Sequence, residues 1–185
     1  AGDAFTGVSI ILMDEGLDTG PVIAKAQLPV LDNDTTASLG LKLSLVAARL
    51  LPDVLPDWAK GRLEAKPQPE DGVTCSGTLD KEDGRIDWRE TAVSIWRKVR
   101  AFQPWPGCHT SWRGRMLKII EAVPLPDGVD ANAGQVIAIS RKSFAVATGD
   151  GILRVLKLQL EGKRVVTAAE FLAGQHNFIG ALLPD

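Results

Sequence analysis

The first third of the chain consists of two short apolar runs and one long stretch with helical periodicity. The β-branched run Val8–Met13 predicts a buried central strand, and Val22–Val30 predicts a second strand. From Ala37 to Lys60 the apolar residues recur at helical spacing, and Pro52 and Pro56 predict two helices or one kinked helix there. Two strands followed by a helix are typical of part of an α/β domain.

The rest of the chain predicts a linker followed by a small β domain. Residues 64–84 contain two prolines, three glycines and many charges, a composition typical of an inter-domain linker. A helix with Ile95, Val99 and Phe102 on one face is expected next, and "QPWPG" stops it. Five strand-like runs then predict a small antiparallel barrel or sandwich, and "TAAEFLAG" predicts a capped last helix. The five runs are "CHTSW", "RMLKIIEAV", "GQVIAIS", "SFAVAT" and "GILRVLKLQL".

Composition adds an uneven distribution of charge to this picture. The chain has 185 residues, of which 45% are hydrophobic and 24% are charged, as in a soluble globular protein of one or two domains. Residues 1–79 carry a net charge of −5, whereas residues 80–185 carry +3 and residues 97–170 carry +6. A basic surface favours polyanions, so the second half is the expected site of nucleic-acid contact.

The cysteines, the histidines and the start of the chain argue against several other classes of protein. Cys75 and Cys108 fit neither a disulfide framework nor zinc-ligand spacing, which favours a cytoplasmic protein. His109 and His176 lie near no cysteine or carboxylate at ligand spacing, so no metal site is expected. No apolar run approaches the roughly 18 residues of a membrane span, so no membrane partner is expected. Ala1 begins no signal peptide, and without an initiator Met the chain is expected to begin inside a larger protein.

The stretch "ILMDEGLDTGPV", Ile11–Val22, holds the strongest candidate for catalysis. Asp18 follows a predicted strand, and the edge of an α/β sheet beyond a strand end is where ligands usually bind. Gly16 and Gly20 would allow a ligand to approach the backbone closely. Aspartate and glycine are also common turn residues, so the local pattern equally allows a turn without chemistry. Asp14 is expected to hydrogen-bond its own turn.

Tryptophans and basic residues gather in the second half of the chain. The tryptophans could stack on nucleic-acid bases or pack into the core. Basic side chains on turns could follow a phosphate backbone, although ordinary solvated surfaces contain such residues too. The tryptophans are Trp88, Trp96, Trp105 and Trp112. The candidates for RNA contact are Lys98, Arg100, Arg113, Arg115, Lys118, Arg141, Lys142, Lys163 and Arg164.

Five stretches, in order along the chain, resemble one known family. They are "TGVSIILMDEGLDTGPV", "KEDGRIDW", "VRAFQPWPG", "VATGDGILRVLKLQLEGK" and "TAAEFLAG". Together they resemble the 10-formyltetrahydrofolate-dependent formyltransferases, and "MDEGLDTG" is typical of those that act on methionyl-tRNA. The loop alone is shared with other formyltransferases, whereas the combination with "RAFQPWPG" and "ATGDG" is more specific.

The resemblance implies a fold of α/β plus β class in three parts. Residues 1–62 would form the C-terminal part of a Rossmann-like formyltransferase catalytic domain, and residues 63–84 would form a linker. Residues 85–185 would form a tRNA-binding antiparallel β-barrel of oligonucleotide-fold type with flanking helices. This division agrees with the charge asymmetry and with the number of predicted strands.

The resemblance also implies an activity and its site residues. The reaction would transfer a formyl group from 10-formyltetrahydrofolate, a co-substrate, to the α-amine of methionyl initiator tRNA for translation initiation. Asp18 matches the catalytic aspartate of the family. The backbone of the loop at Met13, Asp14, Glu15 and Gly16 would line the folate site, and no metal would take part.

Departures from the family pattern lead to two further expectations. The catalytic Asn and His of the family lie in an "NxHxSLLP"-type stretch, which this sequence does not contain. The 185-residue chain alone is therefore expected not to formylate. Val8–Met13 would have an exposed sheet edge, so self-association through that edge, or disorder of the first segment, is also expected.

Three alternative functions stay open at this stage. The first is a related formyltransferase that acts on a sugar-nucleotide amine. The second is the hydrolase domain of a formyltetrahydrofolate dehydrogenase. The third is a tRNA-binding module without catalysis. Salt-dependent tRNA binding by the chain would separate an RNA-binding role from a purely catalytic one.

Overall fold

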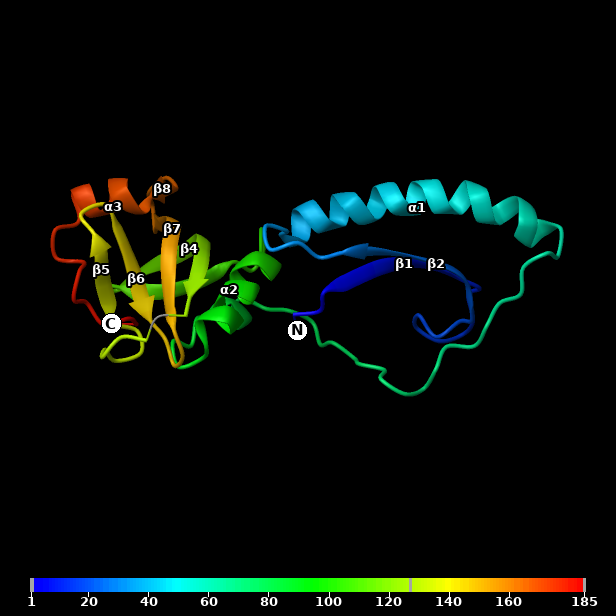
Figure 1. Ribbon diagram of the computed structural model, residues 1–185, viewed down its shortest axis with the longest axis horizontal. Helices are drawn as coiled ribbons and strands as arrows, with labels where there is room; N and C mark the ends of the chain where they lie inside the picture. The colour runs from blue at the N-terminus through cyan, green and yellow to red at the C-terminus, as the bar shows by residue number, and fades with distance from the viewer. Residues whose placement is uncertain (1, 127, 185) are drawn as a thin grey trace. The chain divides into compact units, whose positions relative to one another are not determined.

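The computed structural model describes residues 2–126 and 128–184, which fold into two compact units (Figure 1). The first unit is Ala1–Thr78 and the second is Leu79–Asp185. No helix in these described ranges is both long enough and apolar enough to cross a membrane.

The first unit is an antiparallel hairpin with one long helix packed on it (Figure 1). Strand β1, Phe5–Ile11, pairs with β2, Val22–Pro29. Helix α1, Thr36–Ala59, follows and contacts both strands. The second predicted strand and the predicted helix are confirmed.

The first strand differs from its prediction. A buried central strand over Val8–Met13 is wrong: β1 ends at Ile11, and none of its residues is fully buried. Leu12 and Met13 lie in the loop beyond the strand, with 44% and 87% of their surface exposed. Within the described chain β1 pairs with β2 alone, so no second neighbouring strand covers its other edge.

Helix α1 is one helix, so of the two alternatives, two helices or one kinked helix, the first is wrong. A proline inside a helix removes one backbone hydrogen bond, but its fixed φ suits the helix, and the remaining turns stay bonded. The helix begins with a capping box, in which Thr35 and Ser38 bond each other's backbone N–H. It ends at Ala59 with Lys60 as its C-cap, and Gly61 follows with a left-handed φ of +66°, a common way to end a helix.

The second unit is a six-stranded antiparallel sheet flanked by helices. Its strands pair in the order β3-β4-β7-β6-β5, and β8 pairs with β7. The elements are the 3₁₀ turn η1 (Glu82–Gly84), α2 (Ala92–Ala101), β3 (Cys108–Trp112), β4 (Arg115–Leu125), β5 (Val136–Ser140), β6 (Ser143–Ala147), β7 (Ile152–Leu160), β8 (Val166–Thr167) and α3 (Ala168–Gly174).

The apolar core of the second unit lies between the sheet and its helices. Ile95 and Val99 of α2 are buried, as predicted, and Leu158 of β7 is fully buried. Edge-to-face aromatic contacts join Trp112 to Phe178, whose ring centroids lie 5.0 Å apart. The five predicted strands and the capped last helix are confirmed.

The prediction of an antiparallel β domain is confirmed, but closure into a barrel is not. Within the part of the chain that the structure describes, β3 and β5 stand at the two ends of the strand order and do not pair with each other. Neighbouring strands run antiparallel, so successive connections along the chain alternate between the two ends of the sheet. The β3–β4, β5–β6 and β7–β8 connections therefore share one end, and the β6–β7 turn lies at the other.

Candidate functional site

The loop between β1 and β2 holds Asp18 at its far bend. Asp18 has φ of +57°, in the left-handed region that few residues other than glycine adopt. Aspartate and asparagine tolerate this region better than most side chains because they bond to nearby backbone. The side chain is exposed, so its carboxylate can be reached from solvent.

Asp14 organises the interior of the same loop. Its Oδ1 accepts hydrogen bonds from the N–H of Gly16 at 3.1 Å and from Thr19 Oγ1 at 2.8 Å. The prediction that Asp14 bonds its own turn is confirmed. Gly16 leaves no room for a side chain, because a Cβ there would lie 2.0 Å from Thr19 Oγ1.

Gln68 holds the loop by hydrogen bonds from outside it, a contact that was not predicted from the sequence. Its Nε2 donates to the carbonyl oxygens of Asp18 and Gly20, both at 2.8 Å. Fifty residues separate Gln68 from Asp18, and Gln68 lies in the stretch assigned to the linker. No local pattern could have linked them, because the two residues lie far apart in the sequence.

The outer surface of the loop combines apolar side chains with backbone polar groups. Met13 and Leu17 have 87% and 91% of their surface exposed, and Glu15 is exposed between them. Apolar side chains beside backbone polar groups can contact a planar, polar-edged ligand. The residues expected to line the folate site are therefore accessible on this loop.

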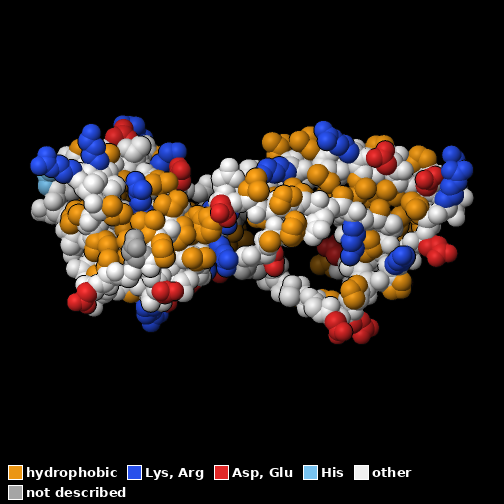
Figure 2. Space-filling view, viewed as in Figure 1, with side chains coloured by type: hydrophobic (Ala, Val, Ile, Leu, Met, Phe, Trp, Pro, Cys, Tyr) orange, Lys and Arg blue, Asp and Glu red, His pale blue; other side chains and the backbone are white. Residues whose placement is uncertain are grey.

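Six of the nine basic candidates are directed to one end of the sheet in the second unit. The β5–β6 and β7–β8 connections each carry two of them, and the other two are Arg113 in the β3–β4 connection and Arg115 at the start of β4. Arg115 and Glu161 join the β3–β4 and β7–β8 connections, because Arg115 Nη2 donates to the carbonyl of Glu161. Figure 2 shows Lys and Arg side chains gathered over this end, near α3 and the β5–β6 turn. We call these six residues the basic turn cluster: Arg113, Arg115, Arg141, Lys142, Lys163 and Arg164.

The other three candidates lie elsewhere on the second unit. Lys98 and Arg100 belong to α2, where Lys98 pairs with Glu90 and Arg100 lies over the Trp96 ring at 4.0 Å. Lys118 lies within β4, opposite His109 of β3. The structure therefore brings six candidates to one end of the sheet and leaves three outside it.

The tryptophans divide between the core and the surface. Trp88 and Trp112 are 2% and 3% exposed, so their rings pack the core and cannot stack on a base. Trp88 Nε1 donates to Thr110 Oγ1 at 3.3 Å. Trp105 is 54% exposed in the "QPWPG" turn.

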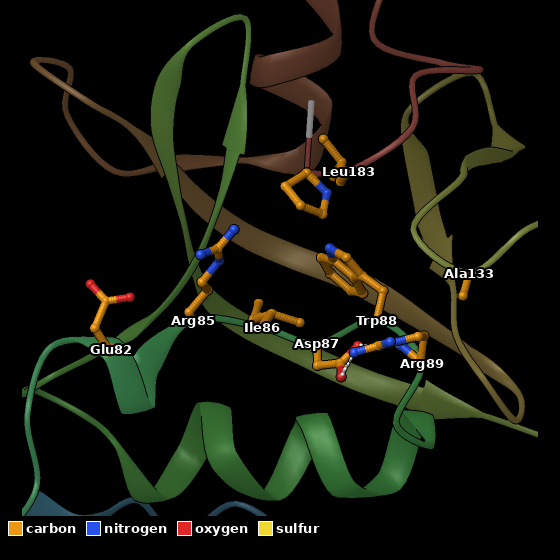
Figure 3. A pocket seen from close by; sticks show the side chains of 9 residues that line it. Glu82, Arg85, Ile86, Asp87, Trp88, Arg89, Ala133 and Leu183 are labelled. Atoms are coloured by element: carbon orange, nitrogen blue, oxygen red, sulfur yellow. Dashed lines mark hydrogen bonds and ion pairs between the residues drawn. The ribbon is translucent and has the colours of Figure 1, made fainter.

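A cavity of about 560 Å³ opens in the second unit between residues 82–89 on one side and Leu183 and Pro184 on the other. Figure 3 shows Leu183 across the cavity from Asp87 and Arg89, which face each other. Arg89 Nε and Nη2 donate to the Asp87 carboxylate at 2.8 and 2.7 Å, and these bonds lower the pKa of Asp87 to about 2. None of the nine lining residues belongs to the predicted site.

Two protein-family models match this chain in succession. The model described as "Formyl transferase" matches residues 1–55, and the model described as "Formyl transferase, C-terminal domain" matches residues 78–176.

Similar proteins agree with these two models. The methionyl-tRNA formyltransferase of Myxococcus xanthus (strain DK1622) is 42% identical over 173 residues, covering 94% of this chain and 55% of that protein. The methionyl-tRNA formyltransferase of Chloroflexus aggregans (strain MD-66 / DSM 9485) is 40% identical over 177 residues, covering 95% and 57%. The chain thus spans about half the length of the curated relatives it matches. The crystal structure of HypX from Aquifex aeolicus in complex with tetrahydrofolic acid has a TM-score of 0.67 at 20% identity, covering 96% of this chain and 32% of that one.

Proposed function

The chain belongs to the formyl transferase family, and from this premise we propose that it is the C-terminal portion of a methionyl-tRNA formyltransferase. The observation that carries the proposal is identity of about 40% to such enzymes over both units, not over the loop alone. The whole protein would transfer a formyl group from 10-formyltetrahydrofolate to the α-amine of methionyl initiator tRNA.

In this reaction Asp18 would stabilise a cationic partner and assist proton transfer. The amine attacks the formyl carbon, a C–N bond forms, and an oxyanion develops on the formyl oxygen. The bond from that carbon to N10 of the folate then breaks, and one proton passes overall from the amine to N10. An exposed carboxylate held at a fixed bend can orient a cationic partner or relay this proton through water, work worth roughly 10²–10⁴-fold in rate.

The folate would bind against the loop that carries Asp18. The backbone groups of Met13, Asp14, Glu15 and Gly16 could pair with the donors and acceptors of the pteridine ring. The exposed Met13 and Leu17 side chains supply apolar contact. HypX, which has a similar fold, has been solved with tetrahydrofolic acid, and this supports a folate site in the same fold.

The tRNA would bind through the second unit, with the basic turn cluster at its centre. Cations on three adjacent turns can contact successive phosphates, and such contacts set the register without reading sequence. We place Lys98, Arg100 and Lys118 at the margins of this surface. We also propose that the six-stranded sheet corresponds to an oligonucleotide-fold barrel, that residues 63–84 link the two domains, and that the enzyme acts in the cytoplasm.

A formylation assay on the protein extended to the length of its relatives tests this function. Methionyl initiator tRNA and an amino-sugar nucleotide are offered separately, each with 10-formyltetrahydrofolate, and folate hydrolysis without acceptor is measured in parallel. Formylation of the tRNA alone is the expected result. Transfer to the sugar nucleotide, or hydrolysis alone, would replace the proposal with one of the other formyltransferase functions. The 185-residue chain is expected to be inactive in the same assay.

A further inference from the structure

The Gln68 side chain makes the contact that fixes the Asp18 bend from outside the loop. One amide nitrogen, Nε2, donates to two carbonyl oxygens, those of Asp18 and Gly20, each at 2.8 Å. Two donors on one planar group aimed at two acceptors define an orientation, which a single hydrogen bond would not. The Asp18–Thr19 and Gly20–Pro21 peptide groups are therefore held together.

A backbone pairing between Lys66 and Val22 holds Gln68 next to the loop. Lys66 pairs with Val22, the first residue of β2, in an antiparallel bridge: Val22 N–H donates to Lys66 O at 2.7 Å, and Lys66 N–H donates to Val22 O at 2.9 Å. Gln68 follows two residues later, directly beside the loop that leads into β2. The segment after α1 thus returns to the hairpin and is anchored there before it reaches the loop.

The bend at Asp18 needs such a restraint. With φ of +57°, Asp18 occupies a conformation that the free chain seldom adopts, and this conformation sets the direction of its Cα–Cβ bond. Asp14 Oδ1 accepts from the Gly16 N–H and from Thr19 Oγ1, so it ties the two sides of the bend together from inside the loop. Gln68 bonds the backbone carbonyl of Asp18 itself, from outside the loop.

We infer that Gln68 is a positioning residue for formyl transfer: it holds the Asp18 carboxylate in its working direction without touching the substrates. This inference rests on the proposed function. Misplacement of a reacting group by about 1 Å can cost on the order of 10²-fold in rate, so loss of the contact is expected to appear in kcat. The KM for tRNA is expected to stay within about twofold, because Gln68 lies in the first unit.

Variants in the protein extended to the length of its relatives test the inference. Gln68→Glu keeps the size of the side chain but turns an acceptor toward the two carbonyl oxygens, whereas Gln68→Lys keeps a donor in reach of both. Gln27→Glu is the matched control, since Gln27 is an exposed residue of β2. The measurements are kcat, KM, the thermal midpoint, and hydrogen exchange of the peptide spanning residues 10–22.

The expected result is a kcat lower by about 10- to 100-fold in Gln68→Glu, with faster exchange of residues 10–22 and an unchanged midpoint. Gln68→Lys recovers most of the rate, and Gln27→Glu matches the parent. A rate loss equal in Gln68→Glu and Gln68→Lys, or one that only follows a lower midpoint, would overturn the inference. If the parent formylates no tRNA, the proposed function fails, and the exchange of residues 10–22 alone decides whether Gln68 holds the loop.

Discussion

The backbone N–H of Gly149 donates to the carbonyl oxygen of Trp88 at 2.9 Å and shares the same hydrogen with Glu90 O at 3.0 Å. The β6–β7 turn is therefore fastened to the segment that leads into α2. Asp150 adds to this contact, because its carbonyl accepts from the N–H of Ala92 at 2.9 Å. The "ATGDG" stretch therefore connects the sheet to the start of α2 through backbone hydrogen bonds.

Replacement of Gly149 by alanine is expected to destabilise the second unit. A Cβ at this position would lie 1.9 Å from Arg89 O and 2.7 Å from its carbonyl carbon, so the turn must move away and lose its hydrogen bonds. Crowding of this kind costs about 1–3 kcal/mol. Urea unfolding followed by tryptophan fluorescence measures the loss. Gly174→Ala is the control, because its added Cβ meets nothing within 4 Å beyond its chain neighbours and its own helix backbone; equal stability of the two variants would contradict the prediction.

Much of this fold could be predicted from the sequence because its signals are local. The alternation in "GILRVLKLQL" and the Thr167 cap before "AAEFLAG" both depend on residues that lie close together in the chain. The burial of β1 could not be predicted, because burial depends on which strands lie beside it. The role of Gln68 was hidden for the same reason, since its partners are 48 and 50 residues away.

Exchange of Asp18 for asparagine is expected to remove formyl transfer and leave the loop intact. Asparagine tolerates the left-handed conformation as well as aspartate does, so the substitution isolates the charge. The expected loss in kcat is about 10²–10⁴-fold in the protein extended to the length of its relatives. Filter binding of methionyl-tRNA serves as the control and should not change. Retention of most of the rate by Asp18→Asn would exclude Asp18 as the catalytic carboxylate.

The basic turn cluster is expected to give tRNA binding a measurable dependence on salt. If it contacts about three to five phosphates, the slope of log affinity against log salt should be about −3 to −4. Arg141→Ala with Lys142→Ala should make the slope shallower by about two, because each phosphate contact contributes about one. Lys60→Ala with Lys81→Ala, which removes the same charge elsewhere, should leave the slope unchanged. Identical slopes for the two double variants would locate the RNA surface elsewhere.

The capping box of α3 is expected to weaken in acid. The Glu170 carboxylate accepts from the N–H and Oγ1 of Thr167 and from Arg164 Nη2, which lowers the pKa of Glu170 to about 2. A lowered pKa stabilises the fold fully above the ordinary value of about 4.5, and this stabilisation is lost as the pH falls toward 2.

Comparison of Glu170→Gln with the parent protein tests this expectation. The parent should be the more stable at pH 7, and the difference in unfolding free energy should shrink steadily between pH 5 and pH 2. Glu82→Gln removes an exposed carboxylate outside the cap and serves as the control. A difference that stays constant over this pH range would show that the cap does not depend on the charge of Glu170.

Helix α1 carries apolar residues on two opposite faces, and this leads to a prediction about the isolated chain. Leu43 and Val54 face the hairpin side with other buried or half-buried residues. Leu41, Leu45 and Leu55 recur at helical spacing on the opposite side, with 65%, 55% and 50% of their surface exposed. Figure 2 shows apolar side chains over the helix and the hairpin. A helix that is apolar on both faces is normally covered on both.

The 185-residue chain is therefore expected to self-associate through its first unit, with the open edge of β1 as a second point of contact. Sedimentation velocity at increasing protein concentration should show species heavier than the monomer. Leu41→Glu with Leu45→Glu should shift the chain toward monomer, because burial of two charges in an apolar contact is strongly unfavourable. Arg49→Glu, which changes an exposed polar position of the same helix, should not do so. A monomer at every concentration, with residues 8–13 protected from hydrogen exchange, would contradict the prediction.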